Sequence, residues 1–196
     1  MNNKENFKKY IEVFLEQNAK LNLISKNDEK FLWEKHIFDS LAIEKFFEKY
    51  QKGKTLLDIG TGGGFPSFPI ALTYPEIEVY ALDSIRKKIN AIENIKQKLD
   101  IKNLLTICDR VENINQKFDI ITSRAVATLD KITTYALPLL SKNGYFIAYK
   151  SISAQDEIAN AKNTFKKFKA EVIDIIEYDL PLEENHTRNL IVIKHI

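Results

Sequence analysis

Four of the six glycines in the chain lie in one short segment, Gly60-Thr61-Gly62-Gly63-Gly64. An apolar run over Thr55–Ile59 precedes this segment, and a helical pattern over Ser67–Thr73 follows it. Glycines between a strand and a helix allow a tight turn and a close approach to a ligand, because no Cβ stands in the way. We therefore expect a nucleotide-binding loop here, although an ordinary flexible turn is the simpler alternative.

The residues around this loop distinguish between cofactors that contain adenosine. A dinucleotide fingerprint, G-x-G-x-x-G, would require glycine at position 65, where the chain has Phe65. Asp58 instead completes the pattern D-x-G-x-G-x-G, which is typical of S-adenosylmethionine enzymes. Asp83 ends the next apolar run, where a carboxylate can accept hydrogen bonds from both ribose hydroxyls. We expect S-adenosyl-L-methionine as the cofactor, bound by Asp58, Gly60, Gly62, Gly64 and Asp83.

The segment Cys108-Asp109-Arg110-Val111-Glu112 follows the third expected strand and can contact an adenine ring. Asp109 or Glu112 can accept a hydrogen bond from the adenine amino group, and Val111 supplies apolar surface. A solvated turn is the alternative for this segment. We expect Val111 and Glu112 to belong to the cofactor site.

The end of the fourth expected strand, Thr122-Ser123-Arg124-Ala125, limits the type of reaction. Enzymes that methylate exocyclic amino groups of bases usually carry Asn/Asp-Pro-Pro-aromatic at this point, and this chain does not. Methylation of pyrimidine C5 needs a cysteine nucleophile, but the single cysteine, Cys108, follows a different strand. The remaining acceptors are already nucleophilic, as guanine N7 is, and they need alignment rather than a general base. Arg124 is our candidate catalytic residue, because it can orient such a substrate or hold the methionine carboxylate.

The composition limits the class of protein further. A net charge of +2 over 196 residues means that any nucleic-acid surface must be local. No apolar run has the length of a signal peptide core or a membrane span, so we expect a cytoplasmic protein without membrane contact. No Cys/His cluster has metal-ligand spacing, and we expect no metal. Nothing in the sequence requires more than a monomer.

Alternating strand and helix patterns predict the architecture. Helical spacing indicates amphipathic helices over residues 5–20 and Glu29–Tyr50. The expected strands are Thr55–Ile59, Glu78–Leu82, Leu104–Cys108, Phe118–Thr122, Tyr145–Tyr149, Val172–Tyr178 and Asn189–Lys194, and the expected helices between them are Ser67–Thr73, Ile85–Leu99, Leu129–Leu140 and Ala154–Phe168. This alternation predicts an α/β fold, a doubly wound, mostly parallel seven-stranded sheet with an antiparallel return at its end. We expect one domain over residues 1–196, in which 1–50 form a helical appendage and 54–196 a Rossmann-like core.

A series of short motifs, in matching order from about residue 20 to the C-terminus, resembles one known family. The motifs are Asn22-Leu23-Ile24, His36-x-x-Asp39-Ser40-Leu41, Leu57-Asp58-Ile59-Gly60-Thr61-Gly62-x-Gly64-Phe65-Pro66, Leu82-Asp83-Ser84, Arg110-Val111-Glu112, Ser123-Arg124-Ala125, Lys150 and Arg188-Asn189-Leu190-Ile191-Val192. Together they resemble the bacterial ribosomal RNA small-subunit methyltransferase G family. The glycine loop alone would be generic, whereas the ordered set is specific.

The resemblance implies a class I, Rossmann-like methyltransferase that modifies N7 of a guanine in 16S ribosomal RNA, presented in a small ribosomal subunit or its precursor. It places Gly60, Phe65, Val111, Glu112 and Arg124 around adenosylmethionine, makes Asp83 the ribose acid, and adds Lys150 as a second catalytic candidate. Two positions depart from the family's usual pattern. The family usually has Pro-Gly after the loop, whereas here Pro66 is followed by Ser67. It usually has Lys-Gly at the end of the fifth strand, whereas here Lys150 is followed by Ser151.

The candidate RNA contacts are charged or are implied by the family motifs. Arg86, Lys87 and Lys88 directly follow the expected ribose acid, so they border the cofactor mouth. His36 and Arg188 come from the resemblance, and packing of the appendage helix is the alternative role for His36. A second basic cluster, Lys166, Lys167 and Lys169, fits a solvated helix face.

Three other functions remain compatible with the sequence. The first is an adenosylmethionine enzyme that acts on a small molecule or a protein. The second is a nicotinamide-dependent oxidoreductase. The third is a non-catalytic nucleotide sensor, because no obvious general base is present.

Overall fold

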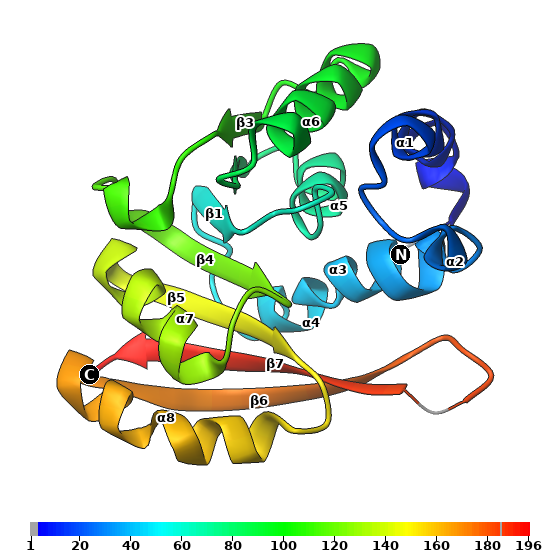
Figure 1. Ribbon diagram of the computed structural model, residues 1–196. Coiled ribbons are helices and arrows are strands. Elements are labelled where there is room, and N and C mark those ends of the chain that lie inside the picture. Colours follow the sequence, from blue (N-terminus) through cyan, green and yellow to red (C-terminus); the bar gives the residue numbers. More distant parts are fainter. Residues whose placement is uncertain (1–3, 185) are drawn as a thin grey trace.

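The computed structural model describes residues 4–184 and 186–196 (Figure 1). Within them one sheet has the strand order β3-β2-β1-β4-β5-β7-β6. The strands are β1 (Thr55–Ile59), β2 (Glu78–Leu82), β3 (Leu104–Ile107), β4 (Phe118–Arg124), β5 (Leu140–Lys150), β6 (Ala170–Leu180) and β7 (His186–His195). Strands β1 to β5 pair in parallel, and β7 is antiparallel to both β5 and β6. The predicted doubly wound, mostly parallel seven-stranded sheet is confirmed.

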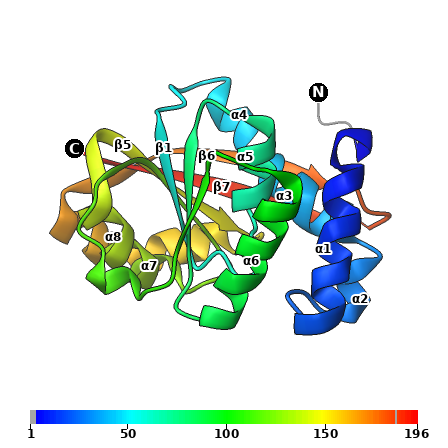
Figure 2. The ribbon, with the colours of Figure 1, turned by 90° about the horizontal axis from the view of Figure 1, so that it is seen from above.

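Helices cover both faces of the sheet, so its strands are apolar on both sides. Leu56 packs into the core on one face, and its neighbour Leu57 packs into the core on the other face. Figure 2 shows α7 (Leu129–Ala136) and α8 (Ala154–Phe168) on one side, and α5 (Ser67–Thr73) and α6 (Arg86–Leu99) on the other. This three-layer arrangement brings the loops after β1, β2, β4 and β5 to one edge of the sheet.

The N-terminal segment packs on the layer that contains α5 and α6. It begins with a short 3-10 turn, η1 (Lys4–Phe7), and continues with α1 (Lys8–Leu21). Phe7, Tyr10 and Phe14 are buried in the same apolar cluster as the sheet residues beneath α5. Asn18 then fixes the following turn, because its side-chain oxygen accepts from the Ile24 amide at 2.8 Å.

The prediction of one helix over Glu29–Tyr50 is wrong. The segment consists of α2 (Lys26–Glu29), a π-helical stretch η2 (Leu32–Phe38), α3 (Asp39–Leu41) and α4 (Ile43–Phe47). Side chains from elsewhere take backbone carbonyls that a regular helix would use. Arg124 donates to the Lys35 carbonyl at 3.2 Å, and Tyr149 donates to the Ser40 carbonyl at 2.8 Å. π-Helical turns are frequent at functional sites.

Other boundaries also differ from the prediction, most of all between α7 and β5. Helix α7 ends at Ala136, and a 3-10 turn, η4 (Leu137–Leu139), follows. Pro138 explains this end, because it lacks the amide hydrogen that would continue the helix. Strand β5 consequently begins at Leu140, before the predicted start at Tyr145. A further 3-10 turn, η3 (Val111–Asn113), follows β3. Within the described residues, no helix is long and apolar enough to span a bilayer.

Candidate active site

The glycine loop needs glycine for two different reasons. Gly60, Gly62 and Gly64 all have positive φ, at 72°, 57° and 90°. A Cβ on Gly60 would lie 2.6 Å from a Val126 methyl, and one on Gly64 would overlap the Phe68 ring. A Cβ on Gly62 would meet no atom nearer than 3.9 Å, so it would project into open space. Gly60 and Gly64 therefore serve packing, whereas Gly62 leaves room for a ligand.

Asp58 lies beneath the loop and is bonded to side chains of the protein. It is fully buried, and its oxygens accept hydrogen bonds from Ser67 at 2.7 Å and Thr122 at 3.1 Å. Burial raises the pKa of this carboxyl, and the hydroxyl donors around it oppose that rise. Asp58 therefore braces the loop, and its expected contact with the cofactor stays a prediction. Ser67, a departure from the family pattern, is one of the hydroxyls that support it.

Asp83 stands at the end of β2 beside the loop. One of its oxygens accepts from the Gly62 amide at 3.0 Å, and the other accepts from the Ile85 amide at 2.9 Å. Each carboxylate oxygen has a second lone pair, which remains available to a sugar hydroxyl. Lys88 lies 3.7 Å from the same carboxylate with about 32% of its side chain exposed, and its expected contact with RNA stays a prediction.

A small cavity of about 420 Å³ opens between the ends of β2, β3 and β4. It is lined by residues from the loops after these strands and from the glycine loop: Ile59, Gly60, Leu82, Asp83, Ser84, Lys88, Asp109, Arg110, Val111, Glu112, Ala125 and Val126. Val111 and Glu112, which we expect at the cofactor, both line this cavity. Asp109 is exposed, and its carboxylate accepts from the Arg110 amide and the Asn113 side chain.

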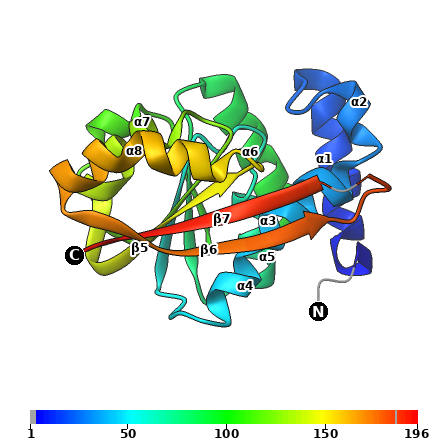
Figure 3. The same cartoon turned by 90° about the horizontal axis from the view of Figure 1, so that it is seen from below.

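A large cavity of about 720 Å³ adjoins the small one at Gly60, Lys88 and Ala125. One wall comes from the N-terminal segment and the opposite wall from the β6–β7 hairpin, whose tip lies beside the N-terminal helices (Figure 3). The lining residues are Leu23, Ile24, Ser25, Asp28, Lys35, His36, Asp39, Gly60, Thr61, Gly62, Gly63, Phe65, Lys88, Arg124, Ala125, Tyr149, Lys150, Ser151, Glu157, Tyr178, Leu180, Leu182, His186 and Arg188. Gly63 lines this cavity. Gly64, which we expected to bind the cofactor, lines neither of the two cavities.

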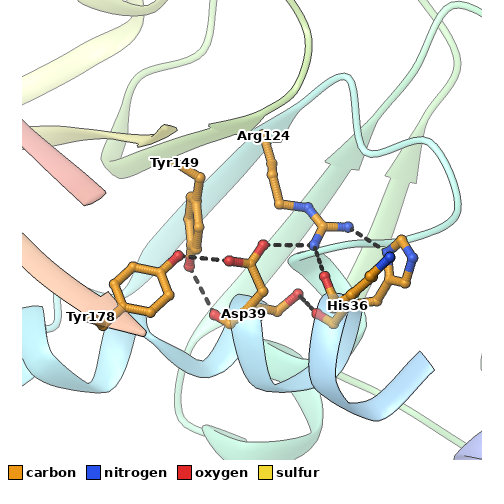
Figure 4. A network of polar contacts seen from close by, with 7 residues as sticks. His36, Asp39, Arg124, Tyr149 and Tyr178 are labelled. Carbon is orange, nitrogen blue, oxygen red and sulfur yellow. Dashed lines mark hydrogen bonds and ion pairs between the residues drawn. The ribbon is translucent and has the colours of Figure 1, made fainter. Parts of the chain in front are cut away.

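Arg124 is the centre of a polar network in the large cavity (Figure 4). Its guanidinium donates to Asp39 at 2.9 Å and to the Lys35 carbonyl at 3.2 Å, and it lies 3.1 Å from His36 Nδ1. The second Asp39 oxygen accepts from the Tyr178 hydroxyl at 2.7 Å. The guanidinium also lies over the Phe65 ring, with 5.3 Å between the carbon and the ring centroid. The appendage thus fixes the side chain at the end of β4.

His36 is neutral and its proton position follows from Arg124. A guanidinium can only donate, so His36 Nδ1 accepts and the proton resides on Nε2. Burial, and after it the neighbouring Arg124 charge, lowers the pKa of His36 to about 4. Nε2 is buried and has no hydrogen-bond partner in the described residues. His36 thus supports Arg124 from the wall of the large cavity, and its expected contact with RNA stays a prediction.

Two tyrosines complete this network as permanent donors. Tyr149 and Tyr178 are both buried, and burial raises the pKa of each hydroxyl well above its ordinary value. Negative charge on Asp39 acts in the same direction on both. Their hydroxyls therefore keep their protons. The sequence did not predict that these two tyrosines meet at Asp39, because they lie on different strands, β5 and β6.

Lys150 lines the large cavity, but its ammonium is already engaged. It donates to Glu157 at 2.6 Å and to the Ala127 carbonyl at 2.8 Å. Only about 10% of the side chain is exposed. The third ammonium hydrogen remains for a ligand, so the catalytic role expected for Lys150 stays a prediction.

The remaining predicted RNA contacts lie at the rim or on a wall. Arg86 and Lys87 are exposed in the first turn of α6. Arg188 lines the large cavity from β7. Each other lysine or arginine of that cavity forms an ion pair, Lys35 with Asp28, Arg124 with Asp39, Lys150 with Glu157 and Lys88 with Asp83. Within residues 4–184 and 186–196, no carboxylate forms an ion pair with Arg188.

Comparisons with known proteins agree with this geometry. The sequence model of the family rRNA small subunit methyltransferase G matches residues 3–195. The protein of this name from Bacillus licheniformis is 36% identical over 97% of the chain and 81% of its own length. The one from Bacillus subtilis is 35% identical over 98% of the chain and 82% of its own length. The chain belongs to this family.

The fold of this methyltransferase G family member is shared by more distant enzymes. The crystal structure of M. jannaschii TYW2 in complex with AdoMet superimposes with a TM-score of 0.60 at 16% identity, over 79% of this chain and 76% of the other. Adenosylmethionine, the cofactor of this methyltransferase, supplies a methyl group carried on a sulfonium. The residues present fit it: Asp83 would hold the ribose, Val111 and Glu112 the adenine, and the open space over Gly62 the methionine half. All of them line the two connected cavities.

Proposed function

We propose that this protein methylates N7 of a guanine in 16S rRNA, with adenosylmethionine as the methyl donor. Family membership supports the small-subunit rRNA as the substrate. The proton acceptors around Arg124 are already occupied, and this observation carries the choice of N7. Guanine N7 has an exposed lone pair and loses no proton when it is methylated, so such an enzyme needs no general base.

Within the described part of the chain, the large cavity offers no free carboxylate to remove a proton. The carboxylates that line it, Asp28, Asp39 and Glu157, all form ion pairs, and His36 Nδ1 already accepts from Arg124. His186 stands at the exposed start of β7. This set suits alignment of an acceptor that is already nucleophilic. Alignment alone can supply several kcal/mol of barrier reduction.

We assign Arg124 as the residue that orients the acceptor or the methionine carboxylate. Its protein contacts use three of the five guanidinium N–H groups, so donors remain for a ligand in the cavity. The Asp39 carboxylate and the Phe65 ring hold its plane. A planar donor held in one orientation is suited to a carboxylate or a base edge.

The target guanine must leave a helix to reach this site. N7 lies on the major-groove edge of the base, and in A-form RNA that groove is too deep and narrow for side chains. We therefore place the target in a loop or flipped out of its stack. A cavity of about 720 Å³ at the sheet edge leaves room for a base beside the methionine half.

Cations outside the ion pairs are the proposed phosphate contacts. Arg86 and Lys87 stand in the first turn of α6, and that turn contains no acidic residue. Positive charge is disfavoured at a helix N-terminus, so these cations do not serve the helix itself. Arg188 is the corresponding contact inside the large cavity. We further propose that the protein acts as one domain and as a monomer, in the cytoplasm, on a small ribosomal subunit or its precursor.

A methyl-transfer assay with labelled adenosylmethionine tests this function. The substrates are small subunits from cells that lack the protein, naked 16S rRNA, and a protein and small-molecule extract. We expect label in the rRNA of the particles and cleavage at one guanine by chemistry specific for N7-methylguanine. Label confined to the extract would instead indicate a small-molecule or protein methyltransferase.

A further inference from the structure

The loop between β4 and α7 borders both cavities. Ala125 lines both of them, and Val126 lines the small cavity while its side chain lies against Gly60. Ala125 has a φ of 55°, in the left-handed region. This conformation costs an alanine about 1 kcal/mol, so the surroundings must hold it in place.

One carboxylate oxygen anchors this loop. Glu157 Oε2 accepts from the Leu129 amide at 2.8 Å and from Lys150 Nζ at 2.6 Å. Lys150 in turn donates to the Ala127 carbonyl at 2.8 Å. Glu157 and Lys150 therefore hold the chain on both sides of Thr128. Glu157 lies in the first turn of α8, where the helix dipole favours a carboxylate.

The pair lies on the wall of the large cavity and is mostly buried. The Lys150 side chain is about 10% exposed and that of Glu157 about 21%. Removing either partner would leave a mostly buried charge without its counterion, which is costly.

We propose that Glu157, acting through Lys150, is a positioning residue that fixes Ala125 and Val126 where the cofactor and the acceptor meet. It deepens the proposed function, because loop position sets the alignment of the reacting atoms. A displacement of about 1 Å in such a site can cost about 100-fold in rate. A purely structural role would instead change stability and leave the rate per folded molecule unchanged.

The test compares Glu157→Ala, Glu157→Gln and Lys150→Met with the wild-type protein. Glutamine can still accept from the Leu129 amide but carries no charge for Lys150. We expect kcat on small subunits to fall about 10- to 100-fold for Glu157→Ala and less for Glu157→Gln. The KM for the particle should stay within about 3-fold, because the RNA contacts lie elsewhere. A Glu157→Ala, Lys150→Met double variant should be no slower than the slower single variant.

Hydrogen exchange of the amides at positions 126 to 129 supplies a readout that does not depend on turnover. We expect faster exchange there in Glu157→Ala and unchanged exchange in β1. Glu16→Gln is the matched control, because Glu16 also lies 2.6 Å from its lysine, Lys98, but in an exposed pair between α1 and α6. It should change neither rate nor exchange.

The proposal would be overturned if amide exchange in the loop of folded Glu157→Ala equalled that of the wild-type protein. It would also be overturned if kcat fell only in proportion to the folded fraction. If the wild-type protein itself methylated no rRNA, the proposed function would fail. The loop exchange would still decide whether Glu157 holds the loop.

Discussion

Arg124 and Asp39 lie 85 positions apart in the chain and form a 2.9 Å ion pair at the base of the large cavity. The arginine ends a strand of the core, and the aspartate belongs to the N-terminal segment. Both side chains are mostly buried, at 16% and 8% exposure. The segment that covers the sheet edge is therefore part of the site itself.

Asp39→Asn should destabilise the protein by roughly 3 kcal/mol, because it leaves the Arg124 charge buried without its counterion. Urea unfolding measures this change. Asp174→Asn is the control: Asp174 lies 2.9 Å from Lys49, but the lysine of that pair is 54% exposed. We expect a loss below about 1 kcal/mol there. Equal losses for the two variants would mean that burial does not strengthen the Arg124–Asp39 pair.

Alanine at two glycines should separate folding from binding. Gly64→Ala should cost roughly 2–4 kcal/mol, because its Cβ would overlap Phe68 at a positive φ. Gly62→Ala should cost only about 1 kcal/mol of strain, yet weaken adenosylhomocysteine binding by about tenfold or more, because its Cβ enters the ligand space. Urea unfolding and calorimetry measure the two effects. The reverse ranking in stability would contradict the assignment.

The pH dependence of stability should carry a contribution from His36. Burial depresses the pKa of this histidine from 6.5 to about 4, so its contribution is fully present above pH 6.5. It is lost as the pH falls from 6.5 towards 4, because protonation then favours the unfolded chain. Over this range the free energy of unfolding of the wild-type protein should fall by up to about 3 kcal/mol more than that of His36→Gln. Parallel stability profiles would show that His36 is not held neutral.

Reversal of charge at Arg86 and Lys87 should weaken rRNA binding and leave adenosylhomocysteine binding unchanged. The slope of log affinity against log salt should fall by about one for each phosphate that the variant no longer neutralises. Lys166→Glu, Lys167→Glu is the matched control, with the same charge change at the far end of α8. A weaker cofactor affinity in the Arg86 and Lys87 variant would show instead that these charges serve the fold.

Arg188→Gln should also lower the salt slope by about one, because Arg188 is the cavity cation without an ion-pair partner in the described residues. The KM for small subunits should rise while the thermal midpoint stays close to that of the wild-type protein. An unchanged KM would remove Arg188 from the RNA path.

The sheet could be predicted from the sequence because each buried strand is a short apolar run between polar breaks. Local signals also identified the glycine loop, Asp83 and the segment around Val111. The break in the helix over Glu29–Tyr50 could not be predicted, because it depends on Arg124 and Tyr149 taking carbonyls from distant strands. Asp58 matched a cofactor motif, yet its buried contact with Ser67 makes it a brace, and a motif does not reveal burial.

The central claim is methylation of a guanine at N7 in 16S rRNA. The most direct measurement maps N7-methylguanine along 16S rRNA from cells with the gene, cells without it, and cells that carry Asp83→Ala in its place. We expect one site that is present only with the wild-type gene, because Asp83→Ala removes the acceptor for the ribose hydroxyls. An identical N7-methylguanine map in all three would contradict the account.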